Sequence, residues 1–321
     1  MKRRDFICGL SGLLAGFCIG NMVNIKADKQ KIEYKNPRQR DISLGGFGIA
    51  ISSHCNLNCK GCDVYSPLAK KEFVTYEQFC KDMEKLKELA PDREFDTVFI
   101  GGEPLLNPEL VQIMYKTKEL FPNAKRAILT NGTLLNKMGN NFWQAIKDTN
   151  VKFSITKYPI NIDFKSIEEK AKEYDIEINY DVVKSDKIYD LKTKKILNEN
   201  PDKDNGFEWS KNILDLSGSQ DWIEKRFTCP HRGIVSYARG NIYYCYVHAY
   251  INAFIDYFKV KIPITKDDYI KIADAKDISE FDDFLSTPKQ LCKYCKQCHN
   301  ICYGDEPLEW GFSKRKITEW T

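Results

Sequence analysis

The chain has almost no excess charge of either sign. Its 49 Lys and Arg residues against 45 Asp and Glu residues leave a formal net charge of +4 over 321 residues. So small an excess, spread along the sequence, is not typical of a nucleic-acid-binding surface, and we expect no nucleic-acid partner. The sequence also lacks an internal repeat at a fixed period. Core residues are plentiful, because 42% of the chain is hydrophobic, and this excludes a disordered or low-complexity protein.

Long hydrophobic runs are scarce, with one exception near the N-terminus. Phe6 to Ile25 contains twenty residues without a charge, just long enough for a membrane span. The preceding Arg-Arg-Asp resembles the start of a twin-arginine export signal. The alternative is a hydrophobic N-terminal helix on a cytoplasmic protein. We expect a cytoplasmic protein, with membrane tethering through residues 6–25 or twin-arginine export as open alternatives, and a polar linker over residues 26–46.

Cysteine is far more frequent than packing needs. The chain has 12 cysteines, but it is too long and too rich in core residues to depend on a disulfide framework. Tight groups of thiols in such a chain indicate metal binding. Three cysteines fall within eight residues, four fall within eleven, and two more form a looser pair: Cys55, Cys59 and Cys62; Cys292, Cys295, Cys298 and Cys302; Cys229 and Cys245.

Short apolar strands alternate with amphipathic helices over the first half of the chain. Thr75 is the expected N-cap of the first helix, with Gln78 completing a capping box. Such alternation implies parallel strands joined by right-handed crossovers, so we expect an α/β barrel or part of one. The pattern predicts strands at 47–52, 96–100, 127–130, 151–156 and 176–183, and helices at 75–90, 108–120, 134–148 and 163–174.

The second half of the chain has a different pattern. Residues 184–205 are polar and lysine-rich, and we expect a loop or a frayed helix there. Val235–Ala238 and Ile242–Tyr246 predict a β-hairpin around Gly240-Asn241. The change in pattern suggests a core domain over residues 47–215 and a cysteine-rich region over residues 216–321.

The first cysteine group has the spacing Cys55-x3-Cys59-x2-Cys62 and directly follows a predicted strand. Three thiolates on one short loop can bind three irons of a cubane cluster and leave the fourth iron without a protein ligand. A closed structural site normally uses four ligands, so an open coordination position is a catalytic feature. The alternative is a zinc site completed by His54 or by a distant residue.

Residues 54–62 read His-Cys-Asn-Leu-Asn-Cys-Lys-Gly-Cys. This segment resembles the signature of the radical SAM superfamily, although Gly61 stands where that family often has an aromatic or apolar residue. Gly101-Gly102-Glu103-Pro104 resembles the family's GGEP motif, which binds the methionyl amino group of S-adenosylmethionine. Weaker matches follow at the ends of the third and fourth predicted strands. The resemblance implies a cofactor-binding set at the carboxyl ends of barrel strands: Gly101, Gly102, Glu103, Pro104, Thr130, Asn131 and Ser154, with Thr156 nearby.

The resemblance also implies a partial (β/α)6 TIM-like barrel and a mechanism. A [4Fe–4S] cluster at Cys55, Cys59 and Cys62 would bind S-adenosylmethionine, and its one-electron reduction would release methionine and a 5′-deoxyadenosyl radical that takes hydrogen from a substrate. Glu103 would position the ammonium group. A low-potential donor of the flavodoxin or ferredoxin type would be the electron partner. No separate acid–base pair is evident, so we assign no catalytic residue.

The C-terminal region resembles the SPASM and twitch extensions of many radical SAM enzymes, and Cys229 and Cys245 fit their first half. The run from Cys292 to Cys302 departs from it, because it has two residues where the full SPASM pattern has five and no seventh cysteine follows. We therefore expect one auxiliary cluster, and a zinc knuckle is the alternative. Its ligands would come from Cys229, Cys245 and two to four of Cys292, Cys295, Cys298 and Cys302.

These motifs do not fix the substrate. Relatives with SPASM-type extensions commonly modify peptides, whereas residues 62–69 and 155–160 look like radical SAM proteins of bacterial surface-polysaccharide loci. A ribosomal peptide and a sugar-linked substrate are both open. The alternative to an enzyme is a non-catalytic iron–sulfur electron carrier or a zinc-stabilised binding module, which would not need an ammonium site at Gly101–Pro104.

Overall fold

The computed structural model describes residues 44–203, 205–209, 213–223, 235–296 and 308–321. The predictions for residues 6–25 and 26–46 fall almost entirely outside these ranges, and those for Cys229, Cys298 and Cys302 do so fully. Among the helices within these ranges, none combines the length and the apolar character needed to cross a bilayer.

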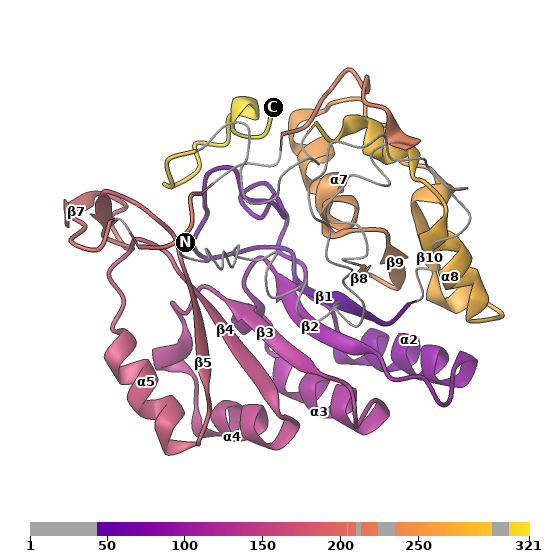
Figure 1. Cartoon of the computed structure of the whole chain (residues 1–321), viewed down its shortest axis with the longest axis horizontal. Coiled ribbons are helices and arrows are strands. Elements are labelled where there is room, and N and C mark those ends of the chain that lie inside the picture. The colour runs from indigo at the N-terminus through magenta and orange to yellow at the C-terminus, as the bar shows by residue number, and fades with distance from the viewer. Residues whose placement is uncertain (1–43, 204, 210–212, 224–234, 297–307) are drawn as a thin grey trace, which may run out of the picture.

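An eight-stranded sheet in the order β10-β9-β8-β1-β2-β3-β4-β5 forms the centre of the molecule (Figure 1). Its first five strands in the chain pair in parallel and agree with the five predicted strands to within two residues at each end. β8 lies parallel to β1, and β9 and β10 continue the sheet antiparallel. The bounds are β1 Gly46–Ser52, β2 Asp96–Gly101, β3 Arg126–Thr130, β4 Val151–Lys157, β5 Ile178–Val182, β8 Ser236–Ala238, β9 Asn241–Tyr243 and β10 Tyr269–Lys271.

Four helices connect the parallel strands and lie along one side of the sheet in Figure 1: α2 Tyr76–Leu89, α3 Leu110–Leu120, α4 Asn140–Thr149 and α5 Phe164–Glu173. Thr75 caps α2 as predicted, because its side chain accepts from the Gln78 main-chain N–H. The predicted capping box is wrong, since the Gln78 side chain donates to Asp82 at 2.9 Å instead. Asp82 also accepts from the Tyr237 hydroxyl at 2.7 Å, which ties α2 to β8.

The parallel α/β sheet with its open edges confirms the predicted partial barrel. In the described part of the chain, the sixth strand of the expected barrel is reduced to one residue, Phe207, which forms a parallel bridge with Val183 just after β5. The hairpin strand β8 supplies the parallel neighbour at the other edge instead.

Two expectations for the second half are wrong. Residues 184–205 hold a small hairpin, β6 Lys187–Tyr189 and β7 Ile196–Glu199, rather than a loop or frayed helix. The predicted hairpin forms as β8 and β9, but α7 Tyr246–Phe258 begins where we expected the end of a strand. Every residue from Tyr246 to Ile251 is buried, and continuous burial hides the period that separates a helix from a strand. A last helix, α8, spans Ser279–Ser286.

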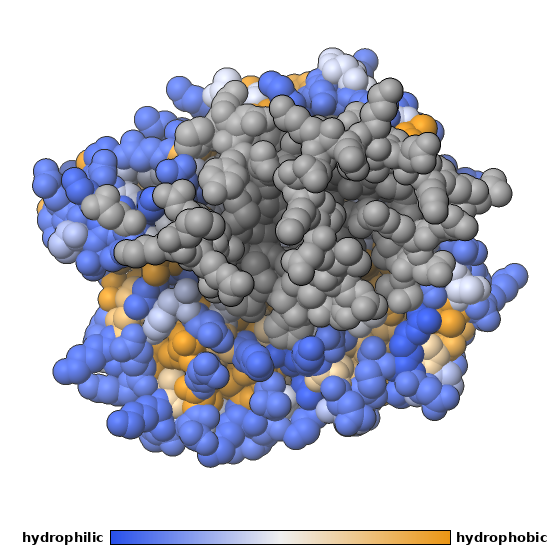
Figure 2. Space-filling model, viewed as in Figure 1, coloured by the Kyte–Doolittle hydropathy of each residue, from blue (hydrophilic) through white to orange (hydrophobic). Residues whose placement is uncertain are grey.

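A single large core fills the space between the sheet and its helices, with fully buried aromatic rings such as Phe95 and Phe121, whose centroids lie 5.3 Å apart. Figure 2 shows hydrophilic residues over most of the described surface that is visible on this side. Because the five parallel strands run in one direction, their carboxyl ends meet at one edge of the sheet. That edge is where the cysteine and glycine motifs lie.

Candidate functional site

The first three cysteines lie on the segment that follows β1, here called the cysteine loop (residues 53–66). Three of its positions have left-handed backbone: Asn58 with φ 67°, Gly61 with φ 64° and Tyr65 with φ 53°. Asparagine and glycine adopt this conformation at low cost, which explains why glycine rather than an aromatic residue precedes Cys62. All three cysteines line one cavity that is partly open to solvent.

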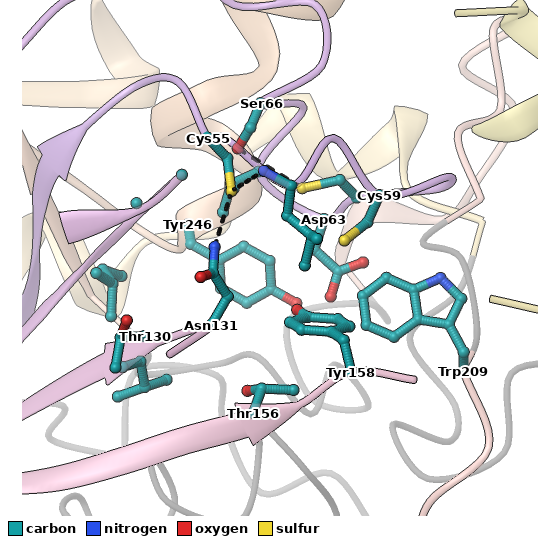
Figure 3. A pocket seen from close by; sticks show the side chains of 17 residues that line it. Cys55, Cys59, Asp63, Ser66, Thr130, Asn131, Thr156, Tyr158, Trp209 and Tyr246 are labelled. Carbon is teal, nitrogen blue, oxygen red and sulfur yellow. Dashed lines mark hydrogen bonds between the residues drawn. The ribbon is translucent and has the colours of Figure 1, made fainter. Parts of the chain in front are cut away.

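The rest of the cavity wall comes mainly from the carboxyl ends of β2, β3 and β4 (Figure 3). The predicted residues on this wall are Gly101, Gly102, Thr130 and Asn131, together with Thr156. Tyr158 was missed, although its place one residue after β4 could have revealed it. Trp209 and Tyr246 were missed because they come from distant segments, and nothing in the local sequence marks them.

Polar groups lie beside the sulfur atoms of Cys55 and Cys62. Cys55 Sγ accepts from the main-chain N–H of Leu57 at 3.3 Å and from the side-chain amide of Asn131 at 3.4 Å, which points at it in Figure 3. Cys62 Sγ lies 3.7 Å from the hydroxyl of Ser66. The two donors to Cys55 favour its thiolate over the thiol, whereas the Cys62 thiol itself donates to the Ser66 hydroxyl.

Burial acts on these thiols in the opposite direction. Loss of water, with a smaller contribution from Glu103, raises the pKa of Cys55 to about 12. Burial also raises the pKa of Cys59 and Cys62 above the ordinary thiol value. Metal binding needs thiolates, so a positively charged centre would have to displace these protons. Three soft sulfur ligands on one loop, with Cys59 buried and Cys55 and Cys62 half-buried, fit an iron–sulfur cluster.

The described residues contain no group of three or more His, Cys, Asp or Glu side chains placed to hold one metal ion. A cubane cluster makes a different demand, because each of its cysteines binds a separate iron atom.

Glu103 faces inward rather than into the cavity. Its carboxylate accepts from the Thr130 hydroxyl at 2.7 Å, the Asn131 main-chain N–H at 2.9 Å and the Leu105 main-chain N–H at 3.1 Å. Burial raises its pKa to about 7, and these three hydrogen bonds oppose the rise. The carboxylate therefore joins the end of β2 to the end of β3, and its predicted contact with an ammonium group stays a prediction.

The two glycines are needed for a close approach of two main chains. Gly101 has φ +135°, and a Cβ there would collide with the Ser52 carbonyl, while a Cβ on Gly102 would collide with the His54 carbonyl. The main-chain N–H groups of Gly102 and Glu103 donate to those same carbonyls, at 2.8 and 3.0 Å. The motif thus holds the start of the cysteine loop against β2 and leaves its own backbone on the cavity wall.

Two further predicted cofactor contacts lie away from the cavity wall, as Glu103 does. Ser154 is buried in the barrel and donates to Asp181 at 3.2 Å. Pro104 is buried and begins a short 3₁₀ turn after Glu103. Their predicted roles stay predictions.

Three cysteines of the expected auxiliary site fall in the described residues. Cys245 is the N-cap of α7, and Cys292 lies in a short turn with its sulfur 3.7 Å from Nε2 of the buried His248. Tyr65 of the cysteine loop is fully buried, and its pKa is raised by burial and by the neighbouring Cys295, Cys245 and Cys62. One tyrosine therefore lies close to thiols of both cysteine groups.

The comparison with known families agrees with this site. Residues 49–184 match the model of the Radical SAM superfamily. The chain is 33% identical over 113 residues to GTP 3′,8-cyclase of Clostridium acetobutylicum, a match that covers 34% of each chain. It is 29% identical over 142 residues to a UPF0026 protein of Helicobacter pylori, covering 43% of this chain and 44% of that one. The matches thus span less than half the length of these curated relatives.

Among solved structures, the chain is similar to that of BtrN in complex with AdoMet and 2-DOIA, with a TM-score of 0.48, 18% identity, and coverage of 83% of this chain and 98% of the other.

A parallel α/β sheet with a three-cysteine loop after its first strand defines a class of proteins that handle iron–sulfur chemistry. Residues 49–184 form a radical SAM domain, as the motifs predicted. Members of this superfamily use a [4Fe–4S] cluster and S-adenosylmethionine. The match ends at residue 184, so a SPASM extension in the C-terminal region stays a prediction.

Proposed function

We propose that the chain is a radical SAM enzyme, in which a [4Fe–4S] cluster supplies the electron that cleaves S-adenosylmethionine and the 5′-deoxyadenosyl radical takes a hydrogen atom from a substrate. The observation that carries this proposal is the arrangement of Cys55, Cys59 and Cys62, which share one loop and line one cavity with the ends of β2 and β3. These three cysteines would hold the cluster, in agreement with the family match.

The chain's own residues would bind and orient the cofactor. The backbone of Gly101 and Gly102 lines the cavity, and main-chain carbonyls are suitable acceptors for a cationic ammonium group. Glu103 would act on the cofactor indirectly, because its hydrogen bonds hold Thr130 and Asn131 in place. Asn131 would in turn fix the sulfur of Cys55.

The substrate would occupy the part of the cavity lined by the aromatic residues Tyr158, Trp209 and Tyr246. These rings would also exclude water from a reactive intermediate. A ribosomal peptide and a sugar-linked molecule both remain open as substrates. A low-potential flavodoxin or ferredoxin is the proposed electron donor.

We further propose one auxiliary cluster in the C-terminal region, with ligands drawn from Cys229, Cys245, Cys292, Cys295, Cys298 and Cys302. The support is that Cys245 and Cys292 are buried in one core, with Cys295 packed against it. Iron counting tests this proposal, because about eight irons per chain indicate two cubane clusters, whereas about four irons with one zinc indicate a zinc knuckle.

The reaction is tested by anaerobic reconstitution of the full chain, followed by dithionite and S-adenosylmethionine and chromatography for 5′-deoxyadenosine. Wild type should form this product and Cys59→Ala should form none. Cys80→Ala is the matched control, because Cys80 lies on α2 beside a separate surface hollow and should keep the activity. A wild type that holds a full cluster but releases no 5′-deoxyadenosine would favour the electron-carrier alternative.

A further inference from the structure

The C-terminal segment (residues 308–321) lies directly on the cysteine loop, although the two are far apart in the sequence. The main-chain N–H of Lys60 donates to the Gly311 carbonyl at 2.8 Å, and that of Ser313 donates to the Asn58 carbonyl at 2.9 Å. Cys59 and Phe312 form an antiparallel bridge between these two bonds. In Figure 1 the C-terminal segment, in yellow, lies beside the loop that follows β1. The middle cysteine is therefore covered by a short strand from the end of the chain.

Trp310 is the most deeply buried ring of this strand, with 1% of its surface exposed. Its ring packs against Tyr158, Tyr189 and Phe312, with centroids 5.6, 5.4 and 5.3 Å away. These contacts come from β4's end, from β6 and from the C-terminal segment itself. The position of the indole is thus fixed on several sides.

The indole N–H of Trp310 is buried, and no described residue accepts a hydrogen bond from it. Native proteins rarely leave a buried donor unsatisfied, so such a group calls for a missing acceptor. Cys59 lies in the same small buried cluster as Trp310, so its sulfur is the candidate acceptor. A thiol is a weak acceptor, whereas a thiolate that carries negative charge is a strong one.

We propose that the C-terminal segment is a cap on the iron–sulfur site, and that Trp310 is a positioning residue whose N–H donates to the sulfur of Cys59 once the cluster is bound. This inference rests on the proposed function, because it requires a cluster at the cysteine loop. Reduction adds negative charge to the cluster and its ligands, and a donor to a ligand sulfur stabilises that charge. Trp310 should therefore make the cluster easier to reduce.

The test is an anaerobic potentiometric titration of the reconstituted full chain, monitored by electron paramagnetic resonance. The signal of the cluster at the cysteine loop is identified as the one that changes when S-adenosylmethionine is added. In Trp310→Phe, which keeps an aromatic ring, we expect reduction to become about tenfold less favourable, equal to about 59 mV for one electron. Trp320→Phe is the matched control. The Trp320 indole also donates to the cysteine loop, at 2.9 Å, but to the Cys62 carbonyl rather than to a sulfur. The reduction potential of the cluster in Trp320→Phe should therefore equal that of wild type.

A second replacement keeps the test decisive if Trp310→Phe fails to fold or to hold iron. β-(3-Benzothienyl)alanine at position 310 has nearly the shape of tryptophan with sulfur in place of the N–H, and it should give the same negative shift. If the protein with benzothienylalanine at position 310 has full iron content and the wild-type reduction potential, the inference is wrong. It is also wrong if Trp320→Phe shifts the reduction potential by the same amount as Trp310→Phe. A wild type that binds no cluster at the cysteine loop overturns both the inference and the proposed function, whereas a normal cluster with an unmoved potential overturns the inference alone.

Discussion

The side-chain amide of Asn131 donates a hydrogen bond to the sulfur of Cys55 over 3.4 Å, although 76 residues separate them in the chain. The same amide donates to the Asn56 side chain at 3.0 Å. The main-chain N–H of Asn131 is held by Glu103. The ends of β2 and β3 thus position the first cysteine through one continuous set of hydrogen bonds.

Asn131→Ala should weaken iron retention. The substitution removes a donor to a charged sulfur, a hydrogen bond of about 1.5 kcal/mol or more, which corresponds to roughly tenfold faster loss of iron to a chelator. The measurement is the decay of the cluster's visible absorption in the reconstituted protein under an anaerobic chelator challenge.

Asn136→Ala is the control for that experiment, since Asn136 is exposed and donates to the Asp163 carbonyl away from the cavity. It should lose iron at the wild-type rate. Equal rates for Asn131→Ala and wild type would show that the amide does not stabilise the bound cluster.

Glu103 should make the metal-free protein less stable as the pH rises. Its pKa in the folded state is about 7, above the ordinary carboxyl value of 4.5, because the group is buried. The folded state therefore binds more protons than the unfolded state between these values. Protonated Glu103 therefore contributes about 3 kcal/mol to the free energy of unfolding. This contribution is fully present below about pH 4.5 and is lost as the pH rises through 7.

Denaturant unfolding between pH 5 and pH 8 measures this effect. Glu103→Gln cannot ionise, so its free energy of unfolding should change less with pH than that of wild type. Glu77→Gln alters an exposed carboxyl in the first turn of α2 and should keep the wild-type pH dependence. A Glu103→Gln profile parallel to that of wild type would contradict the assignment.

Gly102→Ala should damage both stability and iron binding. The added Cβ would collide with the His54 carbonyl, which is main chain and cannot rotate away, so β2 or the cysteine loop must shift. We expect a loss of about 3 kcal/mol in the free energy of unfolding and lower iron content after reconstitution. Gly45→Ala is the matched control, because a Cβ there meets no atom within 4 Å. Wild-type stability and iron content in Gly102→Ala would refute the close-approach argument.

The sequence predicted the local features of this protein well. Five strands, the N-cap at Thr75 and the positions of the three-cysteine loop and the glycine turn all follow from spacing and periodicity within short windows. The errors arose where short-range pattern is ambiguous. Buried residues from Tyr246 onward form a helix rather than a strand, and Gln78 bonds Asp82 because that buried carboxylate lies one turn away.

The surroundings of Glu103 also needed the structure, because a motif does not show which way a side chain turns. Three internal donors compete for this carboxylate, and all of them come from the ends of β2 and β3.

The sequence by itself determined the radical SAM domain over residues 49–184, its parallel α/β pattern and the three cysteines, because these depend on residue types at fixed short spacings. Only the tertiary structure decided what surrounds the cysteine loop. Trp209 donates to the Lys60 carbonyl from 149 residues away, and Trp320 donates to the Cys62 carbonyl from 258 residues away. Contacts at such separations depend on how the whole chain packs, and no local pattern of residues encodes them.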